Sequence, residues 1–137
     1  MSRIEPLFPM EYTRILMPVD CTPTSRDAVR QAARYAMGVT GAAITLVAGV
    51  PPTPGNDSAS KQLRADREAH ADQALETARV ILLQCGIYSR TRRQEASSLQ
   101  EAAEKELTER PYDMALVGKC DQAPKGELPV LILPAIR

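Results

Sequence analysis

Short apolar runs alternate along this chain with longer segments in which apolar residues recur every three or four positions. Short runs bounded by glycine or proline are typical of buried strands, whereas the longer repeating pattern is typical of amphipathic helices. The pattern predicts buried strands at residues 15–19, 43–50, 114–117 and 130–133. A further strand is expected at residues 87–94, where a high density of charge favours the edge of a sheet.

The first predicted helix follows directly after the first strand and carries a stripe of alanines at helical spacing. It begins either at Thr22, with Pro23 at its first position, or at Thr24, with Asp27 three residues later. Gly38 ends it, because glycine readily adopts the backbone conformations that close a helix.

Two more helices are expected before the fourth strand. Residues 51–60 are rich in proline and are predicted to form a flexible loop. Residues 61–84 then form a long amphipathic helix with His70, the only histidine, on its apolar face, where a half-buried structural role is expected. The third helix begins at Ser98, which forms a capping box with Glu101.

This order of elements indicates a single domain over residues 1–137, with an N-terminal extension at residues 1–12. Strands that alternate with helices are typical of a parallel sheet covered on both faces, so the predicted class is three-layered, doubly wound α/β. Only residues 119–129 lie between the last two strands, and a helical crossover usually takes a dozen residues or more. We therefore expect the helix between these strands to be missing.

The composition argues against several classes of function. Seventeen basic and seventeen acidic residues give a net charge of zero, which disfavours general nucleic-acid binding. No apolar run is long enough to cross a membrane, and the first residues do not form a signal peptide. Three cysteines without a C-x-x-C pair indicate a cytoplasmic protein, and no metal-binding or catalytic motif is present. Arg90, Arg92 and Arg93 suit an anionic partner, although a solvated edge strand explains them more simply.

Four segments resemble the universal stress protein family in their order and spacing. Residues 14–20, which read Arg-Ile-Leu-Met-Pro-Val-Asp, are similar to the opening strand of that family, and residues 41–47 are similar to its second strand. Residues 112–118 resemble the fourth strand with its following glycine, and residues 128–133 resemble the closing strand. The resemblance covers about residues 13–134. It implies a Rossmann-like sheet, as in adenine-nucleotide α-hydrolases, with five parallel strands in the order 3-2-1-4-5.

The resemblance also implies where a nucleotide would bind. Members that bind one use a carboxylate after the first strand and a G-x-x-G-(x)9-G-[ST] run after the fourth. Asp20 corresponds to that carboxylate, and the resemblance implies a vestigial nucleotide pocket formed by Asp20, Val50, Gly118 and Lys119. The glycine-rich run is absent, since only Gly126 follows Gly118 and Glu127 stands where the family has serine or threonine. Such runs supply the backbone N–H groups that hold phosphates, so we expect no ATP binding of the family's kind.

A second implication of the resemblance concerns partners. Many members of the family dimerise through the last strand, and their first and fourth helices share one face of the sheet. Without a fourth helix, strands four and five would lie bare on that face, and a bare apolar patch usually marks an interface. We therefore expect a homodimer through this uncovered face and the last strand. The strand residues concerned are Val130, Leu131, Ile132 and Leu133.

Three hypotheses for function follow. The leading one is a non-enzymatic, dimeric regulatory or scaffold module of the stress response that takes no cofactor. The alternative is a protein that binds AMP or ATP through the Asp20 side of the pocket, where doubly wound sheets bind ligands. The third is a thiol redox protein, since Cys21 and Cys120 follow strands expected to be neighbours.

Overall fold

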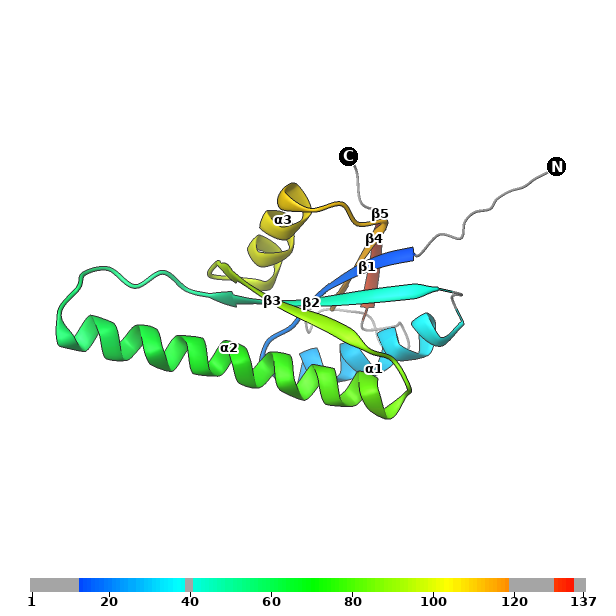
Figure 1. The fold of residues 1–137 in the computed structure, drawn as a ribbon, viewed down its shortest axis with the longest axis horizontal. Helices are drawn as coiled ribbons and strands as arrows, with labels where there is room; N and C mark the ends of the chain where they lie inside the picture. Colours follow the sequence, from blue (N-terminus) through cyan, green and yellow to red (C-terminus); the bar gives the residue numbers. More distant parts are fainter. Residues whose placement is uncertain (1–12, 39–40, 119–129, 135–137) are drawn as a thin grey trace.

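The computed structural model describes residues 13–38, 41–118 and 130–134, which form one five-stranded sheet with three helices (Figure 1). The strands are β1 (Thr13–Pro18), β2 (Ala42–Val50), β3 (Ser89–Glu95), β4 (Met114–Gly118) and β5 (Val130–Pro134). The helices are α1 (Pro23–Met37), α2 (Ser58–Gln84) and α3 (Leu99–Glu109). Each strand and helix predicted from the sequence is therefore found among the described residues.

The strand order is β3-β2-β1-β4-β5, as predicted, and the first four strands are parallel. The prediction that the fifth strand is also parallel is wrong, because β5 pairs with β4 in the antiparallel direction. Eleven residues, 119–129, connect the two strands. Antiparallel neighbours need only a short turn, whereas parallel neighbours need a crossover of a dozen residues or more. The expected absence of a fourth helix concerns this connection, which lies outside the described residues.

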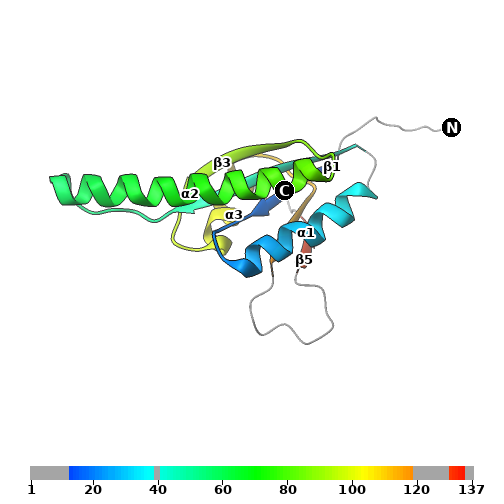
Figure 2. The same cartoon turned by 90° about the horizontal axis from the view of Figure 1, so that it is seen from below.

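The helices divide between the two faces of the sheet. Figure 1 and Figure 2 show α1 and α2 side by side over one face and α3 alone over the other. Right-handed crossovers produce this division, because the chain moves one way from β1 to β3 and the opposite way to β4. The prediction that strands four and five lie bare on the face of the first helix is wrong for β4, and for the side chains of β5, which lie outside the described residues, it stays a prediction. There, α1 contacts both strands, and Leu116 of β4 is fully buried in the cluster formed with α1 and α2.

Local signals set the start of α1. The hydroxyl of Thr22 accepts a hydrogen bond from the backbone N–H of Ser25 at 3.1 Å, and Pro23 occupies the first turn. Thr22 rather than Thr24 is therefore the N-cap. The buried face of α1 is mostly alanine, which has no long side chain to hold the helix away from the sheet.

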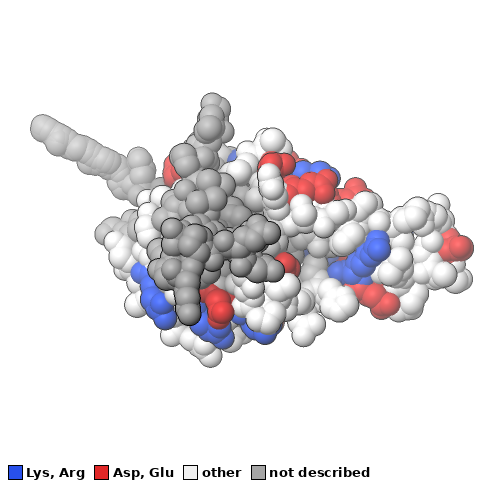
Figure 3. All heavy atoms as spheres, turned by 180° about the vertical axis from the view of Figure 1, so that it is seen from behind, with Lys and Arg blue, Asp and Glu red and all other residues white. Residues whose placement is uncertain are grey.

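Only the second half of α2 packs against the sheet. Its buried residues begin at Ala71, while the first half projects past the sheet and carries acidic and basic side chains together (Figure 1, Figure 3). The prediction that His70 is half-buried on the apolar face is therefore wrong, since it is exposed. The helix also begins earlier than predicted, because Asp57 caps it by accepting a hydrogen bond from the N–H of Ser60 at 2.8 Å. No helix in the described part of the chain is long and apolar enough to cross a membrane.

Candidate functional site

A pocket of about 260 Å³ lies at the carboxyl ends of β1 and β2. Val19 directly follows β1, Ala48 and Gly49 belong to β2, and α2 contributes Ala71 and Ala74. The segment that leads from β3 into α3 closes a further side. The pocket therefore lies at the edge of the sheet where doubly wound folds bind ligands, and small apolar side chains make up much of its wall.

The predicted site residue Asp20 lines this pocket. Its Oδ1 accepts hydrogen bonds from the backbone N–H of Thr22 at 2.9 Å and from the Thr22 hydroxyl at 2.6 Å. Its own N–H donates to the hydroxyl of Ser25 at 3.0 Å. The carboxylate thus stabilises the turn before α1, which is the structural role open to it, while it stays beside the pocket.

The other predicted nucleotide contacts are not brought together in the described residues. Val50 is partly buried and packs against the core cluster of the α1 and α2 face, and it is not part of the pocket wall. Gly118 lies in β4, where its backbone is opposite Val130. Lys119 lies outside the described residues, as does Cys120, so the predicted approach of Cys120 to Cys21 is not tested.

The side of the pocket formed by α2 has residues that sequence reasoning did not assign to a site. Arg67 lines the pocket, and its guanidinium donates to the backbone oxygen of Pro52 at 2.7 Å. This bond ties α2 to the segment after β2. The thiol of Cys21 is exposed and donates to the backbone oxygen of His70 at 3.3 Å. Arg67 gave no signal in the sequence, because its position depends on how far α2 projects beyond the sheet.

The amino end of α3 also borders the pocket. Helix N-termini bind anions when their backbone N–H groups are free. Here the Ser98 hydroxyl accepts a hydrogen bond from the N–H of Glu101 at 3.0 Å, and the Glu101 carboxylate accepts one from the N–H of Ser97 at 2.8 Å. The predicted cap is confirmed, and the protein's own carboxylate already occupies part of this helix end.

Gly49 allows the two sides of the pocket to approach each other. A Cβ atom at this position would lie only 2.9 Å from the backbone oxygen of Ala96, a distance at which side-chain carbons are not tolerated. Glycine therefore lets the end of β2 pass directly against the segment that enters α3. This contact fixes the width of the pocket on that side.

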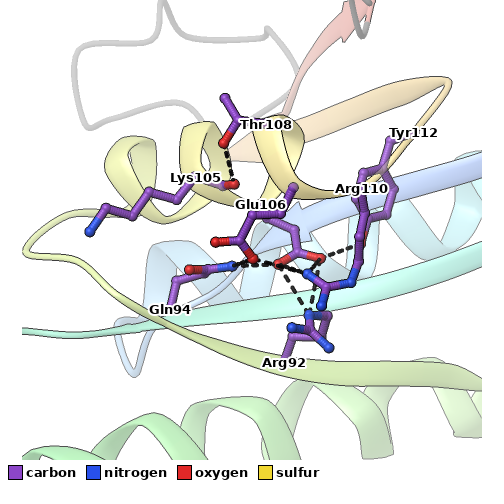
Figure 4. A network of polar contacts seen from close by, with 8 residues as sticks. Arg92, Gln94, Lys105, Glu106, Thr108, Arg110 and Tyr112 are labelled. Carbon is purple, nitrogen blue, oxygen red and sulfur yellow. Dashed lines mark hydrogen bonds and ion pairs between the residues drawn. The ribbon is translucent and has the colours of Figure 1, made fainter.

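A second polar cluster lies between α3 and the sheet, away from the pocket (Figure 4). Its centre is Glu106, which is fully buried. One carboxylate oxygen accepts a hydrogen bond from Gln94 at 2.7 Å, and the other accepts one from the Tyr112 hydroxyl at 2.7 Å. The guanidinium groups of Arg92 and Arg110 lie 3.1 Å and 3.3 Å from the second oxygen. The carboxylate is thus surrounded by donors, which is what a buried charge requires.

These contacts shift two pKa values in opposite directions. Burial raises the pKa of Glu106, but hydrogen bonds from Tyr112, Gln94 and Arg92 outweigh it, so the pKa lies below its ordinary value. Burial and the hydrogen bond to Glu106 raise the pKa of Tyr112 to about 12. Glu106 is therefore ionised and Tyr112 neutral near pH 7. A carboxylate with a lowered pKa and no free lone pair suits a structural role better than acid–base catalysis.

Comparison with known proteins agrees with the fold. The sequence profile of the universal stress protein family matches residues 11–124. A comparison with individually curated proteins gives no significant match.

Solved structures share the fold at low sequence identity. A universal stress protein from Archaeoglobus fulgidus has a TM-score of 0.63 at 18% identity, covering 86% of this chain and 84% of its own. A protein of the same family from Burkholderia pseudomallei has a TM-score of 0.64 at 22% identity, covering 79% and 82%. The universal stress protein UspA from Lactobacillus plantarum has a TM-score of 0.64 at 20% identity, covering 88% and 86%. With a profile match over most of its length, the chain belongs to the universal stress protein family.

Proposed function

We propose that this chain is a non-enzymatic regulatory module of the stress response that does not bind ATP and acts as a homodimer. The observation that carries the proposal is the sequence after β4, where Gly126 is the only glycine and Glu127 follows it. A phosphate cradle is built from several backbone N–H groups, and a carboxylate in its place repels phosphate. The described part of the pocket supports this proposal, because Arg67 and the amino end of α3 are already engaged by the protein itself.

A second function is favoured by the pocket itself. Its volume of about 260 Å³ is slightly below the roughly 300 Å³ at which sites for small molecules usually begin. Its wall is mostly apolar, with Asp20 at the margin. Such a pocket suits a flat heterocycle, such as the base of AMP or adenosine, better than a triphosphate.

Thermal unfolding with added ligand separates the two functions. A ligand present at a hundred times its dissociation constant stabilises a protein by about 2.7 kcal/mol. We expect no rise in Tm with millimolar ATP, and a rise with ATP would contradict the first proposal. A rise with AMP or adenosine would support the second proposal. That rise should be smaller in Asp20→Asn, which keeps the acceptor for Thr22 but loses the charge.

Homodimerisation is proposed to use β5, which forms one edge of the sheet and carries an apolar sequence. Unpaired edges of this kind are usually covered by another chain or blocked by charge. Light scattering during gel filtration should show a dimer for the full chain and a monomer for a variant with Leu131→Lys and Ile132→Lys. Leu83→Lys, at an exposed position on α2, is the matched control and should stay dimeric. A monomeric parent chain would contradict the proposal.

A further inference from the structure

The edge of the sheet opposite β5 is formed by β3, and within the described residues β3 pairs only with β2. The outer side of an edge strand presents backbone N–H and C=O groups that can pair with an added strand. Proteins use such edges to bind extended segments of other proteins, and the side chains beside the edge select the segment. The side chains of β3 therefore indicate which partner would fit.

The three arginines of β3 have different surroundings. Arg93 faces α2, where its guanidinium lies 3.6 Å from the carboxylate of Asp72. Arg92 faces α3 and holds the buried carboxylate of Glu106. Arg90 is exposed and, among the described residues, makes no ion pair or hydrogen bond. Two of the arginines thus stabilise the fold, and the charge of Arg90 remains available.

A groove of about 670 Å³ lies beside Arg90. It is on the same face of the sheet as α3, in the part that this helix does not cover. Arg14 and Arg110 line it from other elements, Tyr88 stands at its margin with 84% of its surface exposed, and no acidic side chain lines it.

We propose that the open edge of β3 and this groove bind an extended, acidic segment of a partner protein, which adds to the sheet as a further strand. Side chains alternate between the two faces of a strand, so every second side chain of the segment would lie on the α3 face. Carboxylates at those positions would lie next to Arg90, whose charge has no partner among the described residues. The other arginines of the groove are already paired, Arg14 with Asp113 and both Arg92 and Arg110 with Glu106. Opposite charges on neighbouring strands attract, and this attraction selects acidic segments.

The same charges argue against a second copy of β3 as the occupant. β3 carries three arginines and one glutamate, so two copies placed edge to edge would repel each other. Charge on an edge strand is a common way to prevent such pairing. This site is also independent of the pocket near Asp20, since the two share no lining residue. The inference therefore goes beyond the proposed function and can fail or succeed separately from it.

The test is fluorescence anisotropy of a labelled peptide of about eight residues that alternates Glu and Val, mixed with the full chain at low salt. Saturable binding is expected for this peptide but not for its counterpart that alternates Lys and Val. Arg90→Glu removes an attraction and adds a repulsion, so it should weaken binding about tenfold. Arg34→Glu is the matched control, because Arg34 is exposed in the last turn of α1 on the other face, and its binding should equal that of the parent chain.

Further ligands in the same binding assay distinguish strand addition from simple attraction of charges. A Glu-Val peptide with every second backbone nitrogen methylated cannot form the backbone hydrogen bonds to β3, so its binding should be lost. The proposal would be overturned if the methylated peptide, or a short oligothymidine, bound as tightly as the unmethylated Glu-Val peptide. It would also be overturned if Arg34→Glu weakened binding as much as Arg90→Glu does. Absence of saturable binding, or a dimer that Arg90→Glu dissociates, would also overturn it. Circular dichroism of both variants confirms that each remains folded.

Discussion

On the face covered by α1 and α2 the packed cluster is apolar, whereas on the face under α3 a buried carboxylate lies beside a smaller apolar cluster. Two helices bury enough of the first face for Ile, Leu, Met and Ala to fill it. A single short helix leaves the second face open at its sides, where Arg92 and Arg110 stay partly exposed and reach Glu106. Apolar burial therefore stabilises one face of this domain, and a network of charged groups stabilises the other.

The largest effect is expected on the apolar face. Leu116→Ala removes a fully buried side chain from β4 beneath α1 and leaves a cavity, so the free energy of unfolding should fall by about 3 kcal/mol. Urea unfolding followed by circular dichroism measures this change. Leu83→Ala, at a residue that is 40% exposed, should change it by less than about 0.5 kcal/mol. A loss at Leu116 no larger than that of the control would show that this face does not depend on close packing.

Glu106→Gln tests the charged face and should lower the free energy of unfolding by about 2 kcal/mol. Each carboxylate oxygen accepts from at least two donors, so the NH2 group of glutamine must face donors in either orientation. Arg92 also loses its buried counter-charge. Glu104→Gln, on the exposed side of the same helix, is the matched control. If both variants were equally stable, the network would not hold α3 in place.

Much of this fold could be predicted, because local signals specify it. Apolar runs predicted most of the strands, and residues with hydroxyl groups just before the helices predicted the N-caps at Thr22 and Ser98. The direction of β5 was mispredicted because the parallel sheet of the family was carried over, although the short connection over residues 119–129 favours an antiparallel pair. The buried face of α2 was misplaced because the helical pattern does not say where the sheet beneath it ends.

The residues of the two candidate sites could likewise be predicted only where local sequence determines their position. Asp20 could be placed at the pocket because it directly follows a buried strand, whereas Arg67 reaches the pocket only because α2 overhangs it. Glu106 is an intermediate case. It follows Ala102 and Ala103 by four and three residues, so helical spacing already puts it on the apolar face. Arg110, four residues further on, is a partner at local spacing. The partners from β3, Arg92 and Gln94, could not be found in this way, because they are distant in the sequence.

Tyr112→Phe is expected to have a smaller effect, about 1 kcal/mol at pH 7, because it removes one hydrogen bond from a carboxylate that keeps its other donors. The raised pKa of Tyr112, about 12 against an ordinary 10.0, also predicts a dependence on pH. A group whose pKa is raised by folding contributes stability that is complete below its ordinary pKa and is lost as pH rises through the folded value. The difference between parent and variant should therefore shrink between about pH 10 and pH 12, and a constant difference would contradict it.

The smallest expected effect is at acid pH, and it compares the two faces within one experiment. The pKa of Glu106 in the folded chain lies below its ordinary value of 4.5. A carboxyl whose pKa is lowered by folding contributes stability above its ordinary pKa and loses that contribution as pH falls through the folded value. The difference in unfolding free energy between the parent chain and Glu106→Gln should therefore shrink as pH falls below about 4.5. The difference for Leu116→Ala should not change over the same range, because no titrating group is altered. Equal pH dependence of the two differences would mean that the charge of Glu106 contributes nothing specific to its face.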